Sequence, residues 1–461
     1  MPLPEAHASR AHASATTTWR WLIEKELREL AASRAYWLLL LVIGALVGHA
    51  FMNSVEIYAE ASGAAGGPAA LSQGLSPLEG IVVPTLGAYD LAATLLFPFV
   101  VIRLIAGDKE TGALSLMLQA PPRFASSVVA KGVALTIAWL LAGTAGALAL
   151  LLWRSMGGHL YAPETSTVIL GHVLRGLLTI GVAAAAGALA ASAASAAIVA
   201  LTITLGTWAL DYVAAARGGA IEEIAQYTPS AALRVFEHGE LRVSTVLVLC
   251  ALAVGGLAIA AIWMQQGRAF SRRATGASAV VLIVALASTL FASVRASRDV
   301  SEDRRNSFPL ADEAALRAID QPLTITVYLA AEDPRLTDLE RGVLAKLRRV
   351  MKHVTVVYGA KGRSGLFEKP NEHYGEVYYD LGGRRAMSRS STQEIVLETI
   401  YELAGRPPPA PIAAEPYRGY PLRANAPSAP WVFFVVWPLA VIGAWWSVSR
   451  PTISRLRSFG E

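Results

Sequence analysis

The chain has 461 residues, of which 54% are hydrophobic and only 16% are charged, and its mean hydropathy is +0.44. Soluble domains carry about 25% charged residues, so this composition indicates a membrane protein. The net charge of +5 comes without a basic patch interleaved with aromatic residues, which argues against nucleic-acid binding. The one cysteine, Cys250, excludes a disulfide framework or a thiolate metal site within one chain.

Eight apolar segments have about the length that a helix needs to cross a bilayer, roughly 20 residues. They are 36–51, 89–105, 128–153, 168–189, 194–213, 244–264, 277–294 and 431–448. The fourth and fifth together are too long for one crossing at about 1.5 Å per residue, so we expect a tight turn near 190–195. Residues 19–34 have the period of an amphipathic interfacial helix, with a plain extension of the first span as the alternative.

The charges of the loops predict which side of the membrane each loop occupies. Residues 20–34 contain four Lys and Arg, whereas the loop at 52–88 contains three glutamates and no Lys or Arg. Three arginines follow the sixth span, and three more follow the eighth. We therefore expect a multi-pass inner (plasma) membrane protein with both termini cytoplasmic and residues 295–430 periplasmic or extracellular.

Residues 295–405 contain no span and have the pattern of a folded domain. Strands are predicted at 323–329 and 354–358, helices at 337–352 and 392–403, and a hairpin at 376–381 and 384–388 around a Gly-Gly turn. The predicted fold class is an α-helical polytopic membrane protein with about eight transmembrane helices and a small extracytoplasmic α/β domain.

The chain then divides into six predicted parts. They are a cytoplasmic N-terminus with the interfacial helix (1–35), a six-helix membrane domain (36–264), a cytoplasmic loop with the seventh span (265–294), the α/β domain (295–405), a Pro-rich linker (406–430), and the eighth span with a cytoplasmic tail (431–461). The proline content of the linker predicts an extended conformation.

The most informative segment, 103–123, reads RLIAGDKETGALSLMLQAPPR and leaves the second span on the predicted cytoplasmic side. Charged residues, a glycine, a short apolar helix and a Pro-Pro stop follow one another. This pattern predicts a polar-ended helix held close to the bilayer. Such a helix would suit docking into a partner's groove, because Leu114, Met117 and Leu118 have little else to bury against. A plain interfacial connection is the alternative.

This segment resembles the signature of type-2 ABC exporter permeases, in which a span ends in an acidic E-K-E-x-G-T-L-x-x-L-L-x-x-P stretch. The segment begins at Arg103, and the residues that carry the resemblance are Asp108, Lys109, Glu110, Thr111, Gly112, Ala113, Leu114, Met117, Leu118 and Pro121. Asp stands at the first acidic position and Ala113 at the usual threonine. Residues 228–244, TPSAALRVFEHGELRVS, are similar to the external segment that precedes the sixth span in gliding-motility permeases.

Residues 298–405 carry a second resemblance, to the auxiliary component of gliding-motility-type ABC systems. The matching residues are Ser307, Phe308, Leu310, Pro322, Ile325, Val327 and Tyr328. The domain is shorter than the family's usual one. The two resemblances together imply a permease fused to a truncated auxiliary component.

The resemblance implies a permease that works with a separate ABC ATPase in two copies, with Arg103–Pro121 as the coupling segment. It also implies a homodimer, or a heterodimer with another permease, in contact with membrane lipid. The chain has no G-x-x-x-x-G-K-[ST], and the Gly/Lys stretch at 359–365 has the wrong spacing. We therefore expect the membrane subunit of an exporter, with ATP hydrolysis in the partner.

No enzymatic activity of its own is expected for the chain. The histidines are scattered without ligand spacing and nothing marks a nucleophile elbow, so we expect no metal site, no catalytic residue and no cofactor. The apolar spans carry no polar code for a substrate. Lipid, polysaccharide, peptide and drug therefore all stay open.

Four charged residues fall in or near the spans, and such residues are candidates for function. Asp90, Lys131 and Asp211 lie near span ends, where extension of the side chain toward the headgroups is the expected explanation. Arg175 lies deeper, and we expect it to face a polar cavity or the dimer seam.

Two other functions stay open. One is a membrane anchor or scaffold that presents the extracytoplasmic domain to an envelope partner. The other is an ion-coupled carrier, which is disfavoured because the sequence has no paired acidic residues at mid-membrane depth and no inverted repeats.

Overall fold

The computed structural model of the protein describes residues 5–61, 76–110, 124–217, 221, 225, 227–265, 267–330, 333–359, 373–410 and 425–449. Within these ranges, eight helices are long and apolar enough to cross a membrane. They are Arg34–Ala61, Leu78–Gly107, Ser126–Ser155, Ala162–Leu189, Ala193–Ala214, Val243–Trp263, Phe270–Ala292 and Ala429–Ser449. Each covers all or nearly all of one predicted span, so the helical class and the number of long apolar helices are confirmed.

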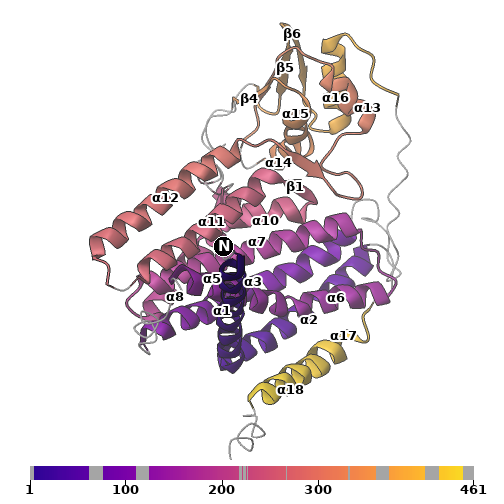
Figure 1. Ribbon diagram of the computed structural model, residues 1–461. Helices are drawn as coiled ribbons and strands as arrows, with labels where there is room; N and C mark the ends of the chain where they lie inside the picture. The colour runs from indigo at the N-terminus through magenta and orange to yellow at the C-terminus, as the bar shows by residue number, and fades with distance from the viewer. Residues whose placement is uncertain are drawn as a thin grey trace, which may run out of the picture.

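The helical part is divided further where the backbone departs from regular α geometry (Figure 1). Its elements are α1 (Glu5–Ala32), α2 (Arg34–Ala61), η1 (Leu78–Val82), α3 (Val83–Glu110), α5 (Phe124–Ala142), α6 (Thr144–Ser155), α7 (Ala162–Leu189), α8 (Ala193–Arg217), α10 (Pro229–Glu237), α11 (Val243–Trp263), α12 (Phe270–Ala292), α17 (Ala429–Trp431), η3 (Val432–Val436) and α18 (Trp437–Ser449). The break at Ser33 makes α1 a separate helix, which packs on α5 and α3 rather than continuing α2.

The tight turn predicted between the fourth and fifth spans lies between α7 and α8. Ser192 and Ser195 each accept a hydrogen bond from the other's backbone N–H, at 3.2 Å. These reciprocal bonds satisfy amide groups at the start of α8 that have no partner within the helix. The chain can therefore reverse here within three residues.

Helix α7 is the centre of the bundle and packs on α3, α5, α8, α10 and α11. It crosses α11 at two glycines, Gly181 and Gly256. A Cβ atom added at Gly256 would lie 2.4 Å from the backbone of Gly181, so only glycine permits this approach. Small residues at helix crossings are typical of membrane proteins, in which close backbone contact replaces the hydrophobic effect.

The seventh and eighth long helices lie at the periphery (Figure 1). Helix α12 packs on α11 and has no buried residue, and Leu282 on it is 70% exposed. Helix α18 packs against α2, where Phe433 of the preceding η3 fits against Gly48. Such wide apolar exposure is the expected surface of a helix that faces lipid.

The α/β domain contains a four-stranded sheet in the order β4-β3-β5-β6. Its strands are β3 (Leu323–Val327), β4 (Val354–Tyr358), β5 (Val377–Leu381) and β6 (Arg384–Ser388), and its helical elements are α13 (Leu310–Arg317), α14 (Pro334–Leu339), η2 (Glu340–Leu344), α15 (Ala345–Val350) and α16 (Gln393–Ala404). Strands β3 and β4 are parallel and joined through α14, η2 and α15. The β5–β6 hairpin turns at Gly382 and Gly383, both with positive φ, as predicted.

A two-stranded sheet joins the two parts of the chain and is not visible in the sequence. Strand β1 (Glu240–Arg242) pairs antiparallel with β2 (Ser297–Asp299). The pairing follows from the packing of α11 on α12, which brings the residues before α11 beside those after α12. The α/β domain is therefore attached to the helical bundle through backbone hydrogen bonds.

Ion pairs hold the α/β domain against the same face of the bundle. Arg305 lies 2.7 Å from Glu79 of η1, at the start of the second long helix. Glu302 lies 2.9 Å from His159, in the segment between α6 and α7. Arg349 on α15 lies 2.9 Å from Glu240 on β1. Loops that the charge pattern places on one side of the membrane thus meet at one face.

Candidate functional site

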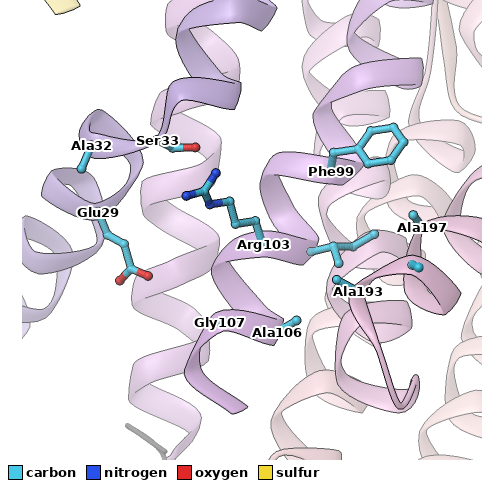
Figure 2. A pocket seen from close by; sticks show the side chains of 11 residues that line it. Glu29, Ala32, Ser33, Phe99, Arg103, Ala106, Gly107, Ala193 and Ala197 are labelled. Carbon is cyan, nitrogen blue, oxygen red and sulfur yellow. The ribbon is translucent and has the colours of Figure 1, made fainter. Parts of the chain in front are cut away.

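A cavity of 610 Å³ opens on the opposite face of the bundle, between α1, α3 and the start of α8 (Figure 2). Helix α3 contributes Phe99, Arg103 and Gly107 to its wall. Figure 2 shows the Arg103 side chain extending toward Ser33 and Glu29, with Ala193 and Ala197 on the other side. The wall is mostly apolar, and its two charged residues are Arg103 on α3 and Glu29 on α1.

Arg103 is the member of the predicted coupling set that the structure places in this cavity. Its side chain is exposed, and no carboxylate of the described residues lies within ion-pair distance of it. An exposed arginine beside an apolar wall can bind an acidic group on another protein in a bidentate manner.

The next three residues of the predicted coupling set follow Gly107 of the cavity wall along α3. Asp108, Lys109 and Glu110 form the last residues of α3. Thr111, Gly112, Leu114, Leu118 and Pro121 lie outside the described residues. The cavity therefore includes Arg103, the first residue of the predicted coupling segment, and α3 continues from the cavity to Glu110.

A buried ion pair fixes α1 beside this cavity. Lys131 on α5 lies 2.6 Å from Glu26 on α1, and both side chains are fully buried. The Lys131 ammonium also donates to the carbonyl oxygen of Leu104 on α3, at 3.2 Å. The expectation that Lys131 extends toward the headgroups is wrong, because α1 covers it and supplies the opposite charge.

A second buried group of charges joins α3 to α7. The Arg175 Nε atom lies 2.9 Å from an Asp90 carboxylate oxygen, and its Nη1 donates to the Ser230 hydroxyl on α10 at 3.1 Å. His172 lies one turn before Arg175, with its Nδ1 atom 3.8 Å from Asp90. All three charged or titratable side chains are buried within one chain.

This geometry corrects the sequence interpretation of Asp90 and defines the place of Arg175. Asp90 does not extend toward the headgroups, because it pairs with the guanidinium inside the bundle. Arg175 is 5% exposed among helices of its own chain, so its partner is an internal carboxylate.

Asp211 on α8 is likewise buried rather than extended to the surface. It accepts a hydrogen bond of 2.6 Å from the Thr228 hydroxyl and one of 3.2 Å from Arg234. Thr228 also caps α10 by accepting from the Ala231 amide. The short helix α10 thus packs on both α8 and α7, and its Ser230 accepts the hydrogen bond from Arg175.

Helix α3 connects the cavity with the buried charges. Asp90 and Arg103 lie 13 positions apart on it, or about 20 Å along the axis. Pro98 lies between them and removes one backbone hydrogen bond within the helix. A displacement at the C-terminal end of α3 can therefore bend the helix at Pro98 or reach the Asp90–Arg175 pair.

Sequence reasoning missed Glu26 as the residue that completes the first pair. The signal is its position: Glu26 falls at helical spacing among Ile23, Leu27 and Leu30, on the apolar face of the predicted amphipathic helix. A carboxylate on an apolar face needs a buried cation as its partner.

Comparison with protein-family models, with curated proteins and with solved structures finds no match for this chain. Among the described residues, no group of three or more His, Cys, Asp or Glu is placed to hold a metal ion. The cavity and the buried charges are therefore the features of the described residues that indicate a function.

Proposed function

We propose that this chain is the permease subunit of an ATP-binding-cassette exporter in the inner membrane, driven by a separate ATPase present in two copies. The observation that carries the proposal is the cavity between α1, α3 and α8, which is lined by Arg103, the first residue of the predicted coupling segment. Its lining by Arg103 and Glu29 beside apolar residues suits a protein partner at the cytoplasmic surface.

Closure of the ATPase dimer on ATP would push on residues 108–121 in this proposal. Helix α3 would carry the displacement to Asp90, whose bond to Arg175 couples it to α7. Helix α7 contacts most of the bundle, so a tilt of α3 would change the packing of several spans at once. The permease would act as a dimer or with a second permease chain.

Co-purification tests the proposal. The full-length chain, tagged and extracted from its native membranes in mild detergent, is expected to bring with it a subunit that hydrolyses ATP. Gly112→Leu, which changes the proposed docking segment, is expected to reduce the recovered ATPase activity about tenfold or more, as when a central interface contact is lost.

Gly206→Leu is the matched control, because a side chain at Gly206 on α8 meets open space. It is expected to leave the recovered ATPase activity unchanged. The proposal is contradicted if the purified chain never brings an ATPase with it, or if the Gly112 and Gly206 variants recover equal activity.

A further inference from the structure

A polar cavity of 800 Å³ lies where the α/β domain meets the ends of the long helices. Its wall combines the N-terminal end of α7, the segment after α12, and helices α13 and α15. Three acidic residues and six basic residues line it, the latter being Arg295, Arg298, Arg304, Arg317, Lys346 and Arg349. The cavity therefore has a clear excess of positive charge.

The acidic residues of the wall are already engaged. Asp299 accepts hydrogen bonds from Ser301 and Asn306, Glu302 lies beside His159, and Glu313 pairs with Arg317. Burial alone would raise the pKa of Asp299, but the hydrogen bonds that its carboxylate accepts outweigh this effect and lower the pKa. These contacts keep the carboxylates from neutralising the remaining arginines.

Three arginines of the wall have no acidic partner. Arg295, Arg298 and Arg304 each lack a carboxylate within ion-pair distance in the part of the chain that the structure describes. Their exposed guanidinium groups border one cavity, where like charges repel one another. An anion bound between them would remove that repulsion and could accept bidentate hydrogen bonds.

Lys346 adds a buried cation to the same wall. It is 7% exposed, its ammonium donates to the Gln393 side-chain oxygen at 3.0 Å, and it lies 5.5 Å from the centre of the Phe308 ring. Both partners are neutral. Burial and the nearby positive charge of Arg349 lower the pKa of Lys346. A bound anion would act in the opposite direction, because a nearby negative charge stabilises the protonated ammonium.

The backbone at Arg304 is strained in a way that supports a functional role. Arg304 has φ of 54°, and it is the one residue other than glycine with positive φ among the described residues. An L-residue in this region costs conformational energy, and such residues gather where a side chain must point in a particular direction. Here the strained residue is one of the three unpaired arginines.

We propose that this cavity binds a phosphate-bearing ligand through Arg295, Arg298 and Arg304, with Lys346 in its wall. A phosphate carries negative charge on several acceptor oxygens around a tetrahedral centre, and pairs of these oxygens can accept bidentate hydrogen bonds from planar guanidinium groups. Arg295 follows the end of α12 at Ala292 by three residues, so the cavity lies at the depth of lipid headgroups if α12 crosses the membrane. A phospholipid headgroup and a soluble phosphorylated molecule share this chemistry.

Thermal unfolding of the full-length chain tests the proposal and separates the two sources. The protein is held in a phosphate-free nonionic detergent at constant ionic strength and titrated with inorganic phosphate, with glycerol phosphate or with phosphatidylglycerol. A ligand that binds the folded state raises the melting temperature in a concentration-dependent way. Stabilisation by the soluble phosphates indicates a soluble ligand, and stabilisation by phosphatidylglycerol alone indicates a headgroup.

Two variants make the test specific to the cavity. Arg298→Gln and Arg304→Gly are each expected to weaken the apparent affinity about tenfold or more, because each removes a charge-assisted hydrogen bond. Arg304→Gly also relieves the backbone strain, so without ligand it should melt no lower than the parent protein. Arg385→Gln is the control, since Arg385 is 82% exposed on β6 and pairs with Asp380 there.

The proposal is overturned if neither the soluble phosphates nor phosphatidylglycerol stabilise the parent protein. It is equally overturned if Arg298→Gln and Arg304→Gly respond to them as strongly as Arg385→Gln does, since the effect would then come from general surface charge. Phosphate binding at this cavity is independent of whether an ATPase drives the chain.

Discussion

Charged side chains buried between helices determine how this bundle is assembled at the residue scale. Glu26 and Lys131 join α1 to α5, and Asp90 and Arg175 join α3 to α7. Inside a membrane, the hydrophobic effect does not favour one helix contact over another, because lipid is as apolar as the side chains. A buried charge does discriminate, because it is costly in any arrangement that separates it from its partner.

The Glu26–Lys131 pair gives a residue-scale prediction. Glu26→Gln or Lys131→Met alone should destabilise the folded protein, because each removes one side of a buried ion pair. The loss should be smaller than the about 3–5 kcal/mol typical of an isolated buried pair, because Lys25 also lies 3.0 Å from Glu26. The double variant should lose much less than the sum of the two. Thermal unfolding in detergent measures all three against the parent protein, and fully additive losses would show that the two groups do not interact.

The charged residues within the spans could be identified from the sequence, but their partners could not. Asp90, Lys131, Arg175 and Asp211 all stand out against apolar neighbours. Glu26 and Lys131, however, are 105 residues apart, and only the packing of α1 on α5 brings them together. When its partner is not known, a charged residue near a span end is predicted to extend toward the headgroups. This prediction was wrong for Asp90, Lys131 and Asp211, which are all buried.

The number of long helices could be predicted at the element scale because length and hydropathy are local properties. A crossing needs about 20 apolar residues, and each such segment stands out in the sequence. The strands of the α/β domain were visible for a similar reason, since β3 alternates buried and half-buried residues. Strands β1 and β2 have three residues each and form through a pairing that links distant segments, so no local pattern predicts them.

Helix crossing at Gly256 gives an element-scale prediction. Gly256→Ala places a methyl carbon 2.4 Å from the Gly181 backbone on α7, so α7 and α11 must move apart. We expect a loss of about 1–3 kcal/mol in stability, as for overpacked cores. Gly206→Ala on α8 meets no atom and should be neutral or slightly stabilising, because alanine favours helix more than glycine. Equal melting temperatures for the two variants would contradict the close crossing.

The whole molecule has two faces with different roles in this account. The α/β domain covers one face through β1–β2 and through ion pairs such as Arg305–Glu79, and the cavity at Arg103 opens at the other. The charge pattern of the loops predicted which loops share a side. The contacts between the domain and the bundle could not be predicted, because they join residues far apart in the sequence, such as Glu79 and Arg305.

Cysteine labelling tests the orientation of these faces. In a Cys250→Ala background, Lys352→Cys and Arg28→Cys each place one thiol at an exposed site, since the native side chains are 70% and 69% exposed. A membrane-impermeant maleimide added to intact spheroplasts should label the first variant and not the second. Detergent permeabilisation should make both react, and labelling of Arg28→Cys before permeabilisation would reverse the proposed topology.

Photocrosslinking from the proposed docking segment tests the central claim most directly. A photoreactive amino acid at Leu114 in the full-length chain, expressed in its native membrane, is compared with the same amino acid at Leu282 on the exposed face of α12. Illumination at Leu114 should yield a crosslinked partner whose peptides contain an ATP-binding G-x-x-x-x-G-K-[ST] loop, and illumination at Leu282 should not. A partner without that loop, or the same partner from both positions, would contradict a permease driven by a separate ATPase.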